Sequence, residues 1–104
     1  MNDFIELKGA SDATYRFRRW AEGAPHLPIA GNYVYVREVG KGFKVVLVGV
    51  ATDLSRCRAE LGKVVPRKAG HVYTRLNVSR ATRHAEHDDL VAAHHPALVS
   101  DIEG

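Results

Sequence analysis

The sequence predicts one α+β domain, built on a small mixed or antiparallel sheet that is flanked by helices and extended by an N-terminal β-hairpin. In the first half of the chain, apolar and polar residues alternate in two hairpin-like pairs of segments. In the second half, two segments combine helix caps with helical spacing of apolar residues. A chain of 104 residues has room for one hydrophobic core. The 45% of apolar residues suffices to fill that core and excludes a disordered tail.

The first hairpin is expected over residues 4–8 and 14–18, joined by a turn-rich segment at 9–12. Two strands alone are marginally stable, so this hairpin must pack on the rest of the domain or on a partner. Residues 21–31 contain two prolines, which cannot donate to a strand ladder, and are therefore expected to form a loop.

A second hairpin is expected over residues 32–39 and 43–50, with its turn at the glycines of residues 40–42. The returning strand is apolar on both faces. This pattern is typical of a strand with neighbours on both sides, so we expect it in the interior of the sheet.

A helix should follow directly, capped by Thr52 or Asp53 and ending near Leu61. Leu54, Cys57 and Leu61 have the spacing of one helical face. Cys57 is therefore expected to be a small buried apolar residue, with a reactive thiol as the alternative. It is the one cysteine of the chain, which excludes an internal disulfide.

The rest of the chain is expected to supply a basic loop at residues 66–70, a third core strand at 72–76 and a second helix. Ser79 is a typical N-cap for that helix and Pro96 ends it.

Basic residues are concentrated in the middle of the chain, although the net charge is only +3. Residues 56–83 carry eight of them against one acid, whereas residues 84–104 carry five acids and no lysine or arginine. Such a cluster suits a polyanion such as nucleic acid, and a solvated surface is the alternative. The eight are Arg56, Arg58, Lys63, Arg67, Lys68, Arg75, Arg80 and Arg83.

A second basic patch is expected in residues 15–20, where aromatic residues alternate with Arg16, Arg18 and Arg19. This composition suits stacking on bases and contact with phosphates. Alternatively, the aromatic residues of an amphipathic strand pack inside the domain. If the hairpin leaves an exposed edge strand, it could also pair with a second copy or a protein partner.

The last helix is rich in histidine, and the spacing could chelate zinc or nickel, with a solvated polar face as the alternative. The residues concerned are His84, His87, His94 and His95. Glu86 on the same helix lies at the margin of the packed face, where a carboxylate needs a partner. That partner is a metal ion, an arginine or a set of backbone donors, with an arginine ion pair as the structural alternative to the metal.

Three segments in order resemble the GIY-YIG nuclease domain. The first is Gly-Asn-Tyr at residues 31–33, the second is Leu-Val-Gly at 47–49 followed by the helix, and the third is Glu86 ahead of a Leu-Val pair and a proline. The resemblance covers residues 30–98 and leaves the hairpin of residues 1–20 as an extension of a single domain.

The resemblance implies a site for phosphodiester hydrolysis. Glu86 would hold one divalent cation, Mg²⁺ or Mn²⁺, and Tyr33 would orient or deprotonate the attacking water. In this family an arginine on the first helix stabilises the charge that grows on the phosphate. We therefore expect Tyr33 and Glu86 to converge on one shallow groove with cationic walls.

Two positions depart from the family pattern. Leu47 replaces the second tyrosine, and Cys57 replaces the arginine of the first helix. Arg56 and Arg58 flank Cys57 but are each turned about 100° away from it around a helix. Loss of one such donor typically lowers the rate by ~10²–10³. The sequence therefore favours a fold with impaired catalysis.

Three functions remain open. The first is a nucleic-acid-binding module, for DNA more than RNA, that uses the basic cluster and Arg16 and Arg18. The second is an active, divalent-metal-dependent DNA endonuclease that uses Tyr33 and Glu86, with Arg56 or Arg58 in place of the lost arginine. The third is a protein-interaction or assembly domain that uses the edge of the N-terminal hairpin.

The expected compartment is the cytoplasm. The longest apolar run, residues 45–51, is too short to cross a bilayer, so no contact with a membrane is expected. The first residues carry acids and no apolar core of a secretory signal.

Overall fold

The computed structural model describes residues 1–65 and 70–103, which form an α+β fold with one mixed sheet. This confirms the fold class expected from the sequence. In chain order the elements are β1 (Phe4–Lys8), β2 (Thr14–Arg19), β3 (Gly31–Val39), β4 (Gly42–Ala51), the 3₁₀ helix η1 (Leu54–Arg56), α1 (Cys57–Leu61), β5 (His71–Leu76), α2 (Arg80–His94) and β6 (Leu98–Ile102).

The sheet has six strands in the order β1-β2-β5-β3-β4-β6. All neighbouring strands are antiparallel except β4 and β6, which are parallel. Strand β4 lies between β3 and β6, which confirms the interior place expected from its two apolar faces. The sequence did not predict β6, so this strand is missing from the expected order of elements.

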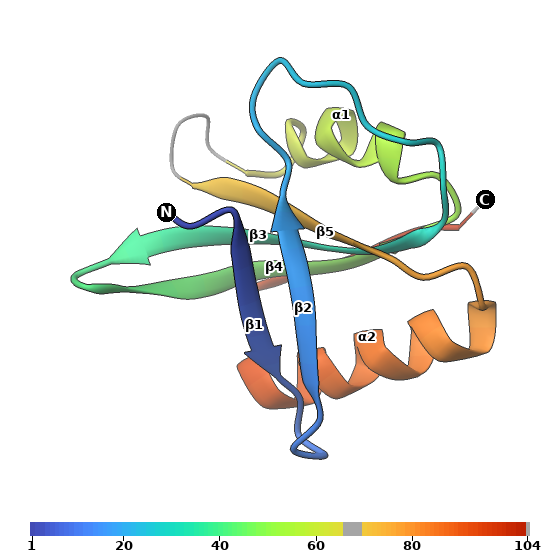
Figure 1. Ribbon diagram of the computed structural model, residues 1–104. Coiled ribbons are helices and arrows are strands. Elements are labelled where there is room, and N and C mark those ends of the chain that lie inside the picture. The colour runs from blue at the N-terminus through green and yellow to red at the C-terminus, as the bar shows by residue number, and fades with distance from the viewer. Residues whose placement is uncertain (66–69, 104) are drawn as a thin grey trace.

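The two faces of the sheet hold separate hydrophobic clusters, because successive residues of a strand point to opposite sides. Val34 and Val36 of β3 pack with β1, β2 and α2. Tyr33 and Tyr35, the alternate residues of the same strand, pack with η1 and α1. Figure 1 shows α1 and α2 on opposite sides of the sheet accordingly.

The N-terminal hairpin packs on the domain itself. Ile5, Leu7 and Phe17 are buried in the cluster on the α2 side. At the hairpin turn, the Asp89 carboxylate of α2 accepts hydrogen bonds from the Ser11 amide at 2.9 Å and the Tyr15 hydroxyl at 2.7 Å. Strand β2 pairs with β5 over only two residue pairs, and the hairpin runs at a steep angle to the other strands of the sheet (Figure 1).

The two residues expected to cap helices, Asp53 and Ser79, cap the 3₁₀ helix η1 and α2, whereas α1 itself follows Arg56 without a side-chain cap. Asp53 accepts a hydrogen bond from the Ser55 amide at 3.0 Å, and the first turn is a 3₁₀ turn before α1. Ser79 caps α2 through the Thr82 amide at 3.3 Å. His95, with a φ of 46°, ends α2 in the left-handed conformation directly before Pro96. Among the described helices, none combines the length and the apolar character needed to cross a membrane.

Candidate nucleic-acid interface

Tyr33 is buried in the layer between the sheet and α1. Its ring lies across Gly49 of β4, where a Cβ atom would stand only 2.2 Å from the Tyr33 Cζ atom. The Tyr33 hydroxyl donates a hydrogen bond to the Ser100 Oγ atom at 2.6 Å. Burial raises the pKa of Tyr33 to about 12. This tyrosine is therefore a protonated core residue that links β3 to β6.

Glu86 points into a polar cluster on the α2 side. Its Oε1 atom accepts hydrogen bonds from the Arg75 Nε atom at 2.8 Å and the Asn77 Nδ2 atom at 3.1 Å. The Asn77 amide also donates to the Asn32 side chain at 3.0 Å. The arginine partner considered for Glu86 is therefore present, in the form of Arg75.

Tyr33 and Glu86 do not converge, and the expectation that they share one groove is wrong. Asn32, the neighbour of Tyr33 on β3, donates a hydrogen bond at 2.8 Å to the backbone carbonyl of Arg83 on α2. Since neighbouring strand residues point to opposite faces, Tyr33 points away from α2 and from Glu86. No group of three or more histidine, cysteine or acidic residues in the described part of the chain could hold a metal ion.

The two arginines that flank Cys57 differ in their surroundings. Arg56 is exposed. Arg58 stacks on Trp20, with its Cζ atom 4.3 Å from the ring centroid, and donates to the backbone carbonyls of Trp20 and Ala21. Cys57 is buried, and burial raises the pKa of its thiol to about 12. This confirms the interpretation of Cys57 as a core residue.

The basic residues of the middle segment do not form one surface. Arg75 is paired with Glu86. Arg83 is buried against Glu103, with its Nε atom 2.6 Å from Oε1, and this hydrogen bond raises the pKa of Arg83 and lowers that of Glu103. Lys63 is paired with Glu60 on the α1 side, and Arg80 is exposed at the start of α2. Arg67 and Lys68 lie outside the described residues.

The histidines of α2 have individual roles. His84 contacts the Glu103 carboxylate at 2.8 Å, and His94 contacts the Lys8 carbonyl at 3.0 Å. His87 is buried, and burial lowers its pKa. These histidines therefore act with the packing of α2 rather than as one chelating set.

Arg16 and Arg18, by contrast, remain exposed on one face of β2. Between them lies Phe4, which is 42% exposed. The Cζ atoms of Arg16 and Arg18 lie 4.0 and 6.0 Å from the centroid of the Phe4 ring. The aromatic residues of β2 instead turn inward, since Phe17 is buried and the Tyr15 hydroxyl binds Asp89.

These three residues form one wall of a groove of about 570 Å³, which we call the Phe4 groove. Its lining includes four arginines and one histidine, and no aspartate or glutamate is among the described residues that line it. It is lined by Phe4, Arg16, Arg18, Arg19, Trp20, Ala21, Ala24, Pro25, His26, Leu27, Thr74, Arg75 and Leu76.

The loop after β2 is fixed over this groove by two side chains. The Trp20 indole donates to the Ala24 carbonyl at 2.7 Å. His26 contacts the Leu27 carbonyl through Nδ1 at 2.8 Å and the Thr74 hydroxyl through Nε2 at 2.7 Å. Since a carbonyl can only accept, Nδ1 carries the proton. The groove is therefore held open by hydrogen bonds of the chain itself.

Sequence reasoning missed Phe4, His26 and Leu76 as members of this surface. Phe4 could have been found from the strand period, because the antiparallel register places it opposite Arg18 on the same face. His26 and Leu76 depend on contacts between segments far apart in the chain.

Comparisons with protein-family models, with curated proteins and with solved structures find no match for the chain.

Proposed function

We propose that this protein binds single-stranded nucleic acid in the Phe4 groove and acts as a binding module without nuclease catalysis. The observation that carries this proposal is an exposed aromatic ring in contact with two exposed arginines, in a groove whose described lining residues include no carboxylate. Phosphates would lie on the guanidinium groups of Arg16 and Arg18, and a base would stack on the outer face of the Phe4–Arg16 pair.

Single strands are favoured over duplexes because an exposed ring can stack only on an unpaired base. The positions of the cations support the same preference, since Arg16 and Arg18 lie on one exposed face of β2 and Arg19 also lines the groove, where they can contact successive phosphates of a strand. We do not propose nuclease catalysis, because Tyr33 is buried on the α1 side of the sheet and Glu86 is paired with Arg75 on the α2 side.

The test is fluorescence anisotropy with labelled single-stranded DNA, single-stranded RNA and double-stranded DNA, with and without Mg²⁺. If about three arginines each displace one counterion, the slope of log K against log salt is about −2, so that raising salt from about 50 to 200 mM weakens binding roughly 15-fold. Single strands should bind more tightly than duplex, and no strand should be cleaved when Mg²⁺ or Mn²⁺ is added.

Two matched pairs of variants locate the site. Phe4→Ala removes the stacking ring and should weaken binding about tenfold. Phe43→Ala removes a ring of similar exposure (38%) at the β3–β4 turn and should leave affinity unchanged. Arg16→Met should weaken binding, whereas Arg37→Met, at an exposed position of β3, should not. Equal effects within either pair, or binding without salt dependence, would contradict the proposal.

The free edge of the hairpin supports a second candidate function, assembly through strand pairing. β1 is the terminal strand of the sheet, so its outer backbone groups have no neighbouring strand among the described residues. In sedimentation experiments this function predicts a dimer that dissociates when Glu6→Pro removes a backbone donor from β1. A monomer at all concentrations would exclude self-pairing.

A further inference from the structure

A second hollow lies beyond the end of the Phe4 groove, between α1 and the start of β5. It has a volume of about 560 Å³, within the range of small-molecule sites. Arg19 and Trp20 line both the groove and this hollow, so the two are continuous along the chain after β2. We call it the Arg58 pocket. It is lined by Arg19, Trp20, Glu22, Tyr35, Arg58, Leu61, Gly62, Val65, Gly70, His71 and Val72.

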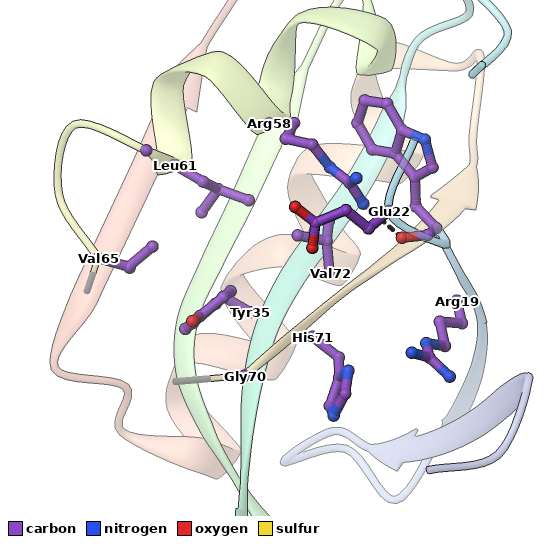
Figure 2. A pocket seen from close by; sticks show the side chains of 11 residues that line it. Arg19, Glu22, Tyr35, Arg58, Leu61, Val65, Gly70, His71 and Val72 are labelled. Atoms are coloured by element: carbon purple, nitrogen blue, oxygen red, sulfur yellow. Dashed lines mark hydrogen bonds between the residues drawn. The ribbon is translucent and has the colours of Figure 1, made fainter. Parts of the chain in front are cut away.

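The pocket combines an apolar floor with a charged rim. Leu61, Val65 and Val72 supply aliphatic surface. Figure 2 shows Arg58 on the upper side of the hollow and His71 and Arg19 on the lower side. A planar, partly apolar ligand with a negative charge at one end matches this distribution.

Arg58 is held so that it can stack on such a ligand. One face of its guanidinium group lies on Trp20, and its terminal nitrogens donate to the Trp20 and Ala21 carbonyls. The Nε atom is buried and has no hydrogen-bond partner among the described residues. A ligand in the pocket would therefore find a guanidinium plane that the chain already holds in place.

We propose that the Arg58 pocket takes one unstacked nucleobase, with its phosphate on Arg19 at the boundary with the Phe4 groove. If the nucleobase belongs to a strand bound in the Phe4 groove, this inference rests on the proposed function. The other source with the same chemistry is a free mononucleotide. The base stacks on the guanidinium face of Arg58 that is turned away from Trp20.

Glu22 gives the pocket a preference among bases. Its side chain lines the hollow and is the one carboxylate among the described lining residues. A carboxylate only accepts hydrogen bonds, so it favours bases with an exocyclic amino group, such as cytosine, over uracil, which presents a carbonyl at the same position. Cytidine monophosphate has an amino donor at C4 and an acceptor at N3, whereas uridine monophosphate has a carbonyl at C4 and a donor at N3. With Glu22 placed at the C4 position, cytidine monophosphate should bind about tenfold more tightly.

The test uses the fluorescence of Trp20, the one tryptophan of the chain, in titrations with each mononucleotide and with a labelled cytosine-containing oligonucleotide. Gly62→Leu places a side chain in the pocket, and its Cβ atom would make only ordinary contacts, at 3.5 Å or more. Ala59→Leu adds the same side chain at an exposed position of α1 outside the pocket and serves as the matched control.

The mononucleotide should quench Trp20 in a saturable way in the wild-type protein and in Ala59→Leu, and at least tenfold more weakly in Gly62→Leu. Glu22→Gln, at an exposed position, should remove the preference for cytidine without affecting the fold. This second variant keeps the test decisive if Gly62→Leu does not fold.

The outcomes separate the two proposals. Oligonucleotide binding that is insensitive to Gly62→Leu, together with no mononucleotide binding, overturns the pocket inference and leaves the Phe4 groove as the strand-binding surface. Mononucleotide binding that Gly62→Leu abolishes, without oligonucleotide binding, supports the pocket as a site for free nucleotide and overturns the proposed function. Absence of both overturns both.

Discussion

Replacing Glu103 by glutamine should destabilise the protein far more than the same change at an exposed glutamate. Arg83 and Glu103 have side chains that are 6% and 7% exposed, and they form two hydrogen bonds, Nε to Oε1 at 2.6 Å and Nη2 to Oε2 at 3.0 Å. The variant leaves the guanidinium covered without its counterion. Removing one partner of a deeply buried pair costs ~3–5 kcal/mol, whereas exposed pairs contribute ~0–1 kcal/mol.

Because Glu103 directly follows β6, the terminal strand at this edge of the sheet, we expect an intermediate loss of about 2 kcal/mol. For a domain of this size the loss lowers the Tm by about 8–16 °C. Thermal unfolding followed by circular dichroism measures it. Glu60→Gln, in an exposed pair with Lys63 at 3.2 Å, is the matched control and should shift the Tm by at most a few degrees.

The pH dependence of thermal stability offers a second test of the Arg83–Glu103 pair. Its hydrogen bond with Arg83 lowers the pKa of Glu103 in the folded protein below the unfolded value of about 4.3. A lowered folded-state pKa adds stability above the unfolded pKa, and this stability is lost as the pH falls through the folded pKa. The Tm gap between wild type and Glu103→Gln should be constant above about pH 5 and narrow below about pH 4. A Tm difference no larger than that of Glu60→Gln, or a difference that is unchanged at pH 3, would show that the Arg83–Glu103 pair does not stabilise the fold in this way.

Three further predictions follow from the packing. Tyr33→Phe removes the hydrogen bond to Ser100 and should lower the free energy of unfolding by about 1 kcal/mol in denaturant titrations; a change in DNA affinity would contradict its structural role. Cys57 should react with a thiol reagent at pH 8 only after unfolding, because burial raises its pKa to about 12, and rapid reaction of the native protein would show an open site. Asp89→Ala should speed hydrogen exchange in β1 and β2 relative to β3, whereas the exposed neighbour variant Asp88→Ala should not; equal exchange in both variants would mean that the hairpin is held by its apolar contacts alone.

Much of the fold is encoded in local patterns that a sequence shows directly. The alternation along β2 places Phe17 inside and Arg16 outside, and the caps Asp53 and Ser79 mark both helix starts. Cys57 lies in the core because it shares a helical face with Leu61. In each case a residue's environment depends mainly on its neighbours within one turn or one strand.

The features that sequence reasoning missed depend on contacts between distant segments. β6 is a short strand in which half-buried and exposed residues alternate, no residue is fully buried and the apolar Val99 is exposed, and its pairing with β4 is parallel. The side of the sheet on which each helix lies is also not a local property. The motif order could therefore place Tyr33 on a strand and Glu86 on a helix, but it could not show that the two lie on opposite faces.

The basic residues at 56–83 show that counting charges along the sequence does not locate a charged surface in the fold. Arg75 and Arg83 add to a basic cluster in the sequence, yet each is matched in space by a glutamate from further along the chain. The positive surface lies instead on β2, where Arg16 and Arg18 flank Phe4. The net charge of a segment indicates which class of partner the protein could bind. Which face of the fold is free to bind that partner depends on which charged side chains are not already in ion pairs.

The most direct test of the account is an amide chemical-shift map of the isotope-labelled protein titrated with a short single-stranded oligonucleotide. We expect the amide chemical-shift changes to be confined to one surface, and the amides of α2 beyond its first turn to stay unchanged. That surface comprises β1, β2, the loop of residues 20–27, β5 and the rim of the Arg58 pocket. Shifts centred on α2 or on the β3–β4 turn, or no shifts in the presence of excess strand, would contradict the claim that this face of the sheet binds nucleic acid.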